Sequence, residues 1–165
     1  MEPIQEDLVE ETWEEVAEFT PNKINKIMQK VGKEQSALLA FIVEFTEDLD
    51  LEVKELAIYM FFNVYLMFKK GFGKKIKLIS PDDVIKCYES NEEFMQSLEG
   101  AHDKFYDRIA RVQISSQPFV MKYVVETLLE PPEVEDEIEL TDEDTGFLFL
   151  LLKTVVDILN DKTDV

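Results

Sequence analysis

The chain is a succession of segments in which apolar side chains recur with the helical period of about 3.6 residues. Across residues 6–19, pairs of acids alternate with pairs of apolar side chains, which predicts an amphipathic helix with an acidic outer face. The residues expected on its inner face are Leu8, Val9, Trp13, Val16 and Ala17. Thr20 and Pro21 then supply an N-cap and a first-turn proline for a second helix, which we expect to end near Gly32.

Three further segments are apolar on most sides rather than on one face. They lie near residues 37–45, 54–68 and 147–159. Helices of this kind lie at the centre of a bundle, where amphipathic neighbours cover them. The sequence therefore predicts that these three helices form the middle of the fold.

Capping signals divide the remaining segments. Ser80 and Pro81 open a helix that is expected to end near Glu89, and Asn91 is expected to cap a separate short helix that ends at Gly100. The other expected helices cover residues 102–114, 118–130 and 143–160.

Every strongly periodic segment has the helical period, and the one strand-like segment, at residues 75–79, has no second strand with which to form a sheet. No internal repeat with a period of about 30–50 residues is present, which argues against a solenoid. The predicted fold class is therefore all-α: a compact irregular bundle of seven to nine helices. We expect a single domain over residues 1–165, with an acidic connector at residues 131–143.

The 165 residues include 36 acids and 17 bases, which gives a formal net charge of -19 at pH 7. Because 45% of the residues are hydrophobic, the chain can fill a core, and a folded chain of this size buries roughly 70% of its surface. The negative charge argues against a partner that presents phosphates, so neither nucleic acid nor an anionic membrane is expected.

The single cysteine, Cys87, cannot form a disulfide within the chain, which fits a reducing compartment. The first residues are acidic, whereas a signal peptide begins with basic and then apolar residues. The longest apolar stretch, at residues 56–68, is shorter than the about 20 residues that a membrane span requires. We therefore expect a soluble, cytoplasmic protein.

The sequence contains no motif for nucleophilic catalysis of the G-x-S-x-G type. Cys87 and the single histidine, His102, lie on different predicted helices, and each is better interpreted as a packing residue in or beside the core. Glu99 and His102 have the spacing of a di-iron motif, but such a site requires that motif twice. We therefore expect no enzyme activity and no cofactor.

Two pairs of acids provide an alternative hypothesis. Glu15-x-x-Glu18 and Glu44-x-x-Glu47 are separated by 25 residues, and each pair lies on a predicted helix. This arrangement resembles the all-α nucleotide pyrophosphatases, whose two helices carry E-x-x-E and E-x-x-D, although Asp48 lies one place beyond the expected aspartate. The resemblance implies a metal-dependent hydrolase in which these four carboxylates hold magnesium against a triphosphate. Acids at this spacing on a solvated helix face need no metal, which is the competing interpretation.

The charges are concentrated in islands. Five lysines without an acid among them form one island: Lys69, Lys70, Lys74, Lys75 and Lys77. Gly71 and Gly73 in this region follow a helix, so they are expected to end it rather than to cradle a phosphate.

An acidic island lies at residues 130–144, which contain nine acids and no base. Its centre consists of Val134, Glu135, Asp136, Glu137 and Ile138. One hypothesis is that this segment is a mobile arm that captures a basic partner; the alternatives are that it folds over the lysine island or is a solvated linker. Both islands are candidate partner-binding sites.

Together these patterns favour a non-enzymatic protein-binding adaptor, a regulator or a small chaperone-like factor, whose polarised charge steers association with a basic protein. The alternative is the metal-dependent hydrolase with carboxylates on two helices. A third hypothesis is an acidic mimic of nucleic acid. The sequence leaves the oligomeric state open.

Overall fold

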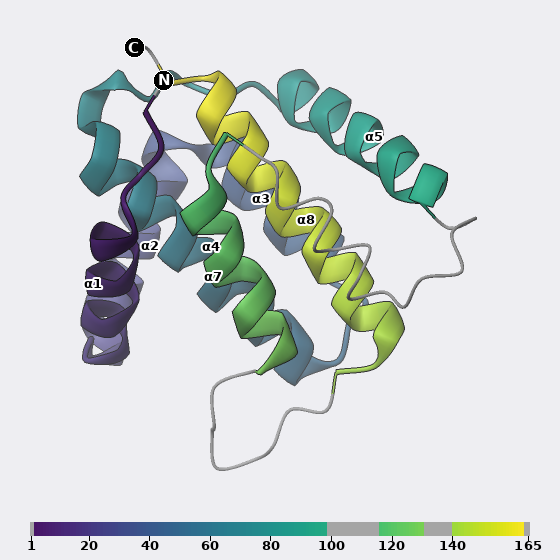
Figure 1. The fold of residues 1–165 in the computed structure, drawn as a ribbon. Helices are drawn as coiled ribbons and strands as arrows, with labels where there is room; N and C mark the ends of the chain where they lie inside the picture. Colours follow the sequence, from purple (N-terminus) through teal and green to yellow (C-terminus); the bar gives the residue numbers. More distant parts are fainter. Residues whose placement is uncertain (1, 99–115, 131–139, 164–165) are drawn as a thin grey trace.

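The computed structural model describes residues 2–98, 116–130 and 140–163, and these ranges are helical throughout apart from short connections (Figure 1). The elements are α1 (Glu6–Ala17), α2 (Pro21–Glu34), α3 (Ser36–Phe45), α4 (Leu51–Phe72), the 3-10 turn η1 (Gly73–Lys75), α5 (Pro81–Leu98), α7 (Pro118–Leu129) and α8 (Asp142–Asp161). Within the described ranges there is no β-sheet; Ile76 and Thr163 form one isolated antiparallel bridge. The prediction of an all-α bundle of seven to nine helices is confirmed.

Helices α4 and α8 form the centre of this bundle. α8 contacts α4, α5 and α7, and Figure 1 shows it running between α7 and α5. Phe61 and Phe68 of α4 and Phe149 of α8 are completely buried, as the apolar segments 54–68 and 147–159 predict. The third apolar segment, α3, is less enclosed, because Val43 on it is 39% exposed. No helix within the described ranges has the length and apolar character that crossing a bilayer requires.

Local capping determines where three helices begin. The hydroxyl oxygens of Thr20, Ser80 and Thr141 each accept a hydrogen bond from the backbone N–H three residues later, at 3.2, 3.1 and 3.0 Å. Such a cap satisfies one of the N–H groups that the first helical turn leaves without a partner. The starts of α2, α5 and α8 are therefore encoded by residues at those positions.

Two glycines near helix ends have different roles. The prediction that the second helix ends near Gly32 is wrong, because α2 continues to Glu34. A Cβ atom at Gly32 would lie only 3.3 Å from the Leu39 side chain, so this glycine allows a close approach of α3. Gly73, after α4, has a φ of 57°, a positive value that glycine adopts more readily than any residue with a Cβ atom.

The prediction of a break in the fifth helix at Asn91 is also wrong, because α5 runs without interruption from Pro81 to Leu98. The Asn91 side chain does not cap a helix. It points sideways to α8, where it donates to the Thr154 hydroxyl at 3.2 Å and accepts from the Lys153 ammonium at 2.7 Å. Because both ends of the amide have partners on α8, the Asn91 side chain can be buried while α5 continues through this position.

The inner face of α1 also differs from the prediction. Val9, Thr12 and Val16 are buried, whereas Trp13 is 40% exposed and Ala17 is exposed. α1 packs against α4 and α7, and the contact runs along the row 9, 12 and 16. Thr12 can be buried there because its hydroxyl donates to a backbone carbonyl one turn earlier, at 2.7 Å. Trp13 is therefore turned away from the core.

Several predictions from the sequence concern residues outside the described ranges. These are the helix at 102–114, His102, the end of a helix at Gly100 and most of the acidic connector, including Val134, Glu135, Asp136, Glu137 and Ile138.

A buried glutamine connects three distant parts of the chain. The Gln117 side chain accepts from the backbone N–H of Ile4 at 2.8 Å and donates to the side-chain oxygen of Asn160 at 3.0 Å. Gln117 is 1% exposed and Ile4 is 4% exposed, so water cannot easily replace these bonds. This contact holds the segment before α1 against the start of α7 and the end of α8.

We predict that Gln117→Ala lowers the free energy of unfolding by about 1–3 kcal/mol, because it leaves the buried Ile4 N–H without its partner. Denaturant unfolding followed by circular dichroism measures this change. The matched control is Gln29→Ala on the exposed face of α2, which should change stability by less than about 0.5 kcal/mol. Equal stabilities of the two variants would contradict a clamping role for Gln117.

Candidate functional site

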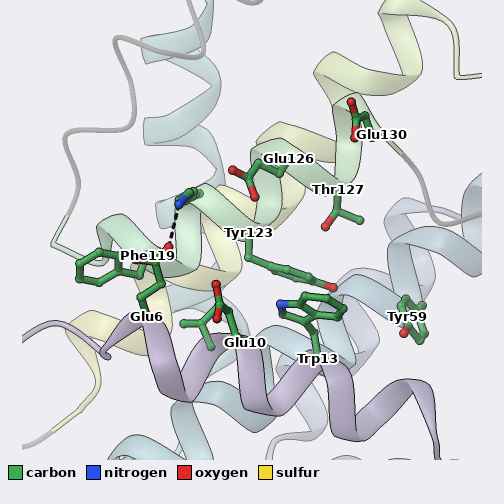
Figure 2. Close-up of a pocket in the computed structure, with 11 residues that line it drawn as sticks. Glu6, Glu10, Trp13, Tyr59, Phe119, Tyr123, Glu126, Thr127 and Glu130 are labelled. Carbon is green, nitrogen blue, oxygen red and sulfur yellow. Dashed lines mark hydrogen bonds and ion pairs between the residues drawn. The ribbon is translucent and has the colours of Figure 1, made fainter.

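A groove with a cavity volume of about 330 Å³ lies between α1 and α7 and reaches Tyr59 of α4 (Figure 2). We call it the α1/α7 groove. Its aromatic lining residues are Trp13, Tyr59, Phe119 and Tyr123, and its acidic ones are Glu6, Glu10, Glu126 and Glu130. Val9, Lys122 and Thr127 complete the lining.

Two aromatic side chains from opposite helices dominate the interior of the groove. Figure 2 shows the Tyr123 ring extending from α7 toward Trp13 on α1. Tyr123 is 9% exposed and forms part of the floor, whereas Trp13 is 40% exposed and forms a wall that solvent reaches. An exposed aromatic wall over a buried aromatic floor provides flat faces on which a ligand can stack.

The rim of the groove is strongly acidic. Its four carboxylates are opposed by a single lysine, Lys122, whose ammonium lies 2.7 Å from a Glu6 carboxylate oxygen. The hydrogen bond and the charge of Glu6 raise the pKa of Lys122, and the charges of Glu126 and Glu10 act in the same direction. Within the described residues Glu10 and Glu126 form no ion pair of their own. The groove therefore carries a net negative charge, and its carboxylates already stabilise one ammonium group.

The floor contains a polar atom without a partner. The Tyr123 hydroxyl is buried, and no described residue forms a hydrogen bond with it. Burial raises the pKa of this hydroxyl, and a negative charge on Tyr59 would do so too. Thr127 opposes the rise, but it does not meet hydrogen-bond geometry with the hydroxyl. The group is thus a neutral hydroxyl with unused capacity to donate and accept.

This combination of groups suits the binding of a cation. Aromatic faces attract cations through their ring quadrupole, and carboxylates accept hydrogen bonds from ammonium and guanidinium groups. The described residues that line the groove include no thiol, histidine or serine. Its chemistry therefore matches a positively charged group on a ligand.

The structure describes all four carboxylates of the hydrolase hypothesis, Glu15, Glu18, Glu44 and Glu47. Glu15 forms an ion pair with Lys70, so its charge is already balanced. Among the described residues, no group of three or more histidine, cysteine, aspartate or glutamate side chains is arranged to hold a metal ion. No described geometry therefore supports the magnesium site that the resemblance implies.

The lysine island is partly neutralised by the chain itself. Lys69 lies 3.3 Å from Glu34, and Lys70 pairs with Glu15 of α1. The backbone of Lys77 is fixed as well, because its carbonyl accepts from Gln35 at 2.9 Å. Lys74 and Lys75 are exposed at the end of α4. The two ion-paired lysines are therefore less available to a partner than the sequence suggests.

Cys87 is not a reactive thiol. It packs against the hydrophobic core and is half-buried. Burial raises the pKa of the thiol to about 12, and the charges of Asp157 and Asp161 contribute to the rise. At neutral pH the group is therefore protonated, whereas a nucleophilic cysteine requires the thiolate.

A second hollow, of about 600 Å³, lies between α5 and the end of α8. Its lining is polar, and several of its charges are paired within the chain. Asp83 lies 3.2 Å from Lys162, and Asp157 lies 2.6 Å from Lys153. Because these charges already have partners, this hollow is a weaker candidate for a charged ligand than the α1/α7 groove.

Comparison with protein-family models, with curated proteins and with solved structures finds no match to this chain. The site therefore has to be interpreted from its own residues.

The groove cannot be predicted from the sequence, because α1 and α7 are far apart in the chain; the ion pair between Glu6 and Lys122 spans 116 positions. One signal was available. Trp13 is the single tryptophan of the chain, and it lies in the most acidic helix. A large aromatic residue surrounded by acids on one amphipathic helix can indicate a surface for a cation rather than a core residue.

We predict that Tyr123→Phe raises the free energy of unfolding by about 0.5–1 kcal/mol, because it removes a buried hydroxyl that has no partner. The matched control is Tyr65→Phe, which removes a hydroxyl that donates to Glu34 at 3.1 Å and should destabilise by about 1 kcal/mol. Denaturant unfolding measures both. A destabilised Tyr123→Phe would mean that this hydroxyl has a partner in the folded protein.

The ion pair of Glu34 generates a pH-dependent prediction. Burial alone would raise the pKa of Glu34, but hydrogen bonds from Lys69 and Tyr65 and the nearby lysine charges lower it overall. A carboxyl with a lowered folded-state pKa stabilises the fold above its unfolded-state pKa, and this contribution is lost as the pH falls through the folded-state pKa. Glu34→Gln should therefore be less stable than the wild type near pH 7, and the difference should shrink as the pH falls below the ordinary pKa range of glutamate.

The control for this pH dependence is Glu47→Gln, which changes an exposed glutamate that has no ion pair with a described residue. If the two variants differ from the wild type by the same amount near pH 7, the ion pair with Lys69 does not contribute to stability.

Proposed function

We propose that this chain is a non-enzymatic protein-binding adaptor, regulator or small chaperone-like factor, and that it captures a basic partner protein through the α1/α7 groove. The observation that carries the proposal is the composition of that groove: four carboxylates around an aromatic interior, with one lysine opposing them. A surface of this kind is complementary to lysine or arginine side chains on a partner.

The total charge supports the same class of partner. A net charge of -19 creates a long-range field that accelerates the approach of a basic protein and slows the approach of an acidic one. The ion pairs of Lys69 and Lys70 reduce the positive surface that would attract an acidic partner. The free thiol of Cys87 fits a reducing compartment, and we place the function in the cytoplasm.

The test compares two variants that lose the same charge at different places. Glu10→Gln/Glu126→Gln removes two carboxylates from the groove, one on each helix. Glu89→Gln/Glu93→Gln removes two exposed carboxylates from α5, a helix that packs against α3 and α8. Both variants have a formal charge of -17, because each removes two of the negative charges that give -19.

Each tagged protein is used to capture partners from lysate of its own cells at low and at moderate salt. We expect a defined basic protein to be retained by the wild type and by the α5 variant, and less of it at the higher salt. The groove variant should bind that protein between about 2- and 30-fold more weakly, since an exposed charge pair contributes about 0.2–1 kcal/mol. Equal binding by the two double variants would contradict the proposal.

A further inference from the structure

We infer that the α1/α7 groove recognises an arginine side chain of the partner, whose guanidinium enters between Trp13 and Tyr123. This inference rests on the proposed function and specifies which chemical group the groove binds. Three properties of the groove support it: its aromatic faces, its unpaired acceptors and the lysine at its rim.

The aromatic faces of the groove, Trp13 on its wall and Tyr123 on its floor, favour a planar cation. Trp13 presents an exposed indole from α1, and the Tyr123 ring extends toward it from α7 (Figure 2). A guanidinium is planar and weakly hydrated, so it stacks on aromatic faces, whereas the ammonium of lysine is a compact and strongly hydrated charge. A volume of about 330 Å³ is at the lower end of ligand pockets, which suits one side chain with its flanking backbone.

The hydrogen-bonding groups of the groove are complementary to the same cation. Glu10 and Glu126 face the groove from opposite helices and form no ion pair with a described residue. The Tyr123 hydroxyl is buried and can accept a hydrogen bond that no described residue donates. A guanidinium has five N–H donors and no acceptor, so it can satisfy a carboxylate on each side and the hydroxyl below.

One cation of the chain itself, the ammonium of Lys122, lies at the rim of the groove. Lys122 is about half exposed and pairs with Glu6, and the charges of Glu10 and Glu126 also act on its ammonium. The positive charge of this lysine at the rim opposes the entry of a second cation. Removal of Lys122 should therefore strengthen binding, whereas removal of Glu10 and Glu126 should weaken it.

The experiment uses the full chain and its single tryptophan. Because Trp13 lines the groove, its fluorescence reports directly on occupation of the site. The probes are three glycine-serine peptides of the same length that carry arginine, lysine or citrulline at the same positions. Citrulline keeps the shape of arginine and removes its charge. Each peptide is titrated into the wild type, the two double variants, Lys122→Ala and Tyr123→Phe.

We expect a saturable change in Trp13 emission with the arginine peptide, a Kd for the lysine peptide at least about threefold higher, and no saturation with citrulline. Glu10→Gln/Glu126→Gln should raise the Kd for arginine by about 2- to 30-fold, and Glu89→Gln/Glu93→Gln should leave it unchanged. Lys122→Ala should lower this Kd by about two- to fivefold. Tyr123→Phe should raise the Kd for arginine more than the Kd for lysine, because only the guanidinium is expected to reach the floor.

Equal affinities for the arginine and lysine peptides, or no saturation with arginine, would overturn the recognition of arginine. The proposed function would survive either result as long as partner capture still requires Glu10 and Glu126. If partner capture does not require those carboxylates, the proposed function itself fails. An arginine affinity that depends equally on the groove and the α5 carboxylates would indicate general attraction to an acidic protein, and it would also overturn the inference.

Discussion

The burial of two helices that are apolar on nearly all sides is the constraint on which the rest of this structure depends. α4 and α8 contain eleven buried residues each, and they pack against one another. Since burial of one large apolar side chain contributes about 1.5–3 kcal/mol, neither helix can remain exposed to water. α1, α5 and α7 cover them with one apolar face each, so the outer faces of these three helices are free for charges. The acidity of the surface is therefore compatible with the stability of the core.

Buried polar side chains then determine how the covering elements are positioned. Gln35 donates to the Lys77 carbonyl at 2.9 Å and accepts from the Ile79 N–H at 3.1 Å, which holds the connector after α4 against the junction of α2 and α3. Gln117 holds the segment before α1 in a similar way, because its side chain accepts a hydrogen bond from the backbone N–H of Ile4. Hydrophobic contacts tolerate small shifts, whereas an unpaired buried N–H costs about 1–3 kcal/mol. The spacing of α1 and α7, and with it the shape of the groove, is thus fixed in part by a single amide.

Properties that depend on neighbouring residues could be predicted from the sequence, and properties that depend on distant helices could not. The caps at Thr20, Ser80 and Thr141 act within one helical turn, so the local sequence encodes them. Asparagine is a residue type that often caps helices, but the partners of Asn91 lie on α8, about 60 positions away, and they allow α5 to continue. The periodicity of α1 places Trp13 on the apolar face, but it defines that face only approximately. In the structure the row through Val9 and Val16 faces α4 and α7, and Trp13 lies beside this row. The groove exists because the row through Val9 and Val16 faces inward and leaves Trp13 at the surface. The sequence therefore indicates it only by an isolated tryptophan among acids.

The acids of α1 are only partly balanced by lysines of the chain itself. Of the acids on α1, Glu15 is paired with Lys70 and Glu6 with Lys122, whereas Glu10 has no ion pair within the described residues. These pairs are part-exposed, and such pairs contribute only about 0–1 kcal/mol. The fold therefore does not depend on them, and a cation that also contacts the aromatic interior gains cation–π attraction of about 0.5–2 kcal/mol, which Lys122 at the rim does not obtain. If a partner presents a cation to the groove, as we propose, that cation can contact the carboxylates and the aromatic interior without any change in the core, because the core does not depend on these ion pairs.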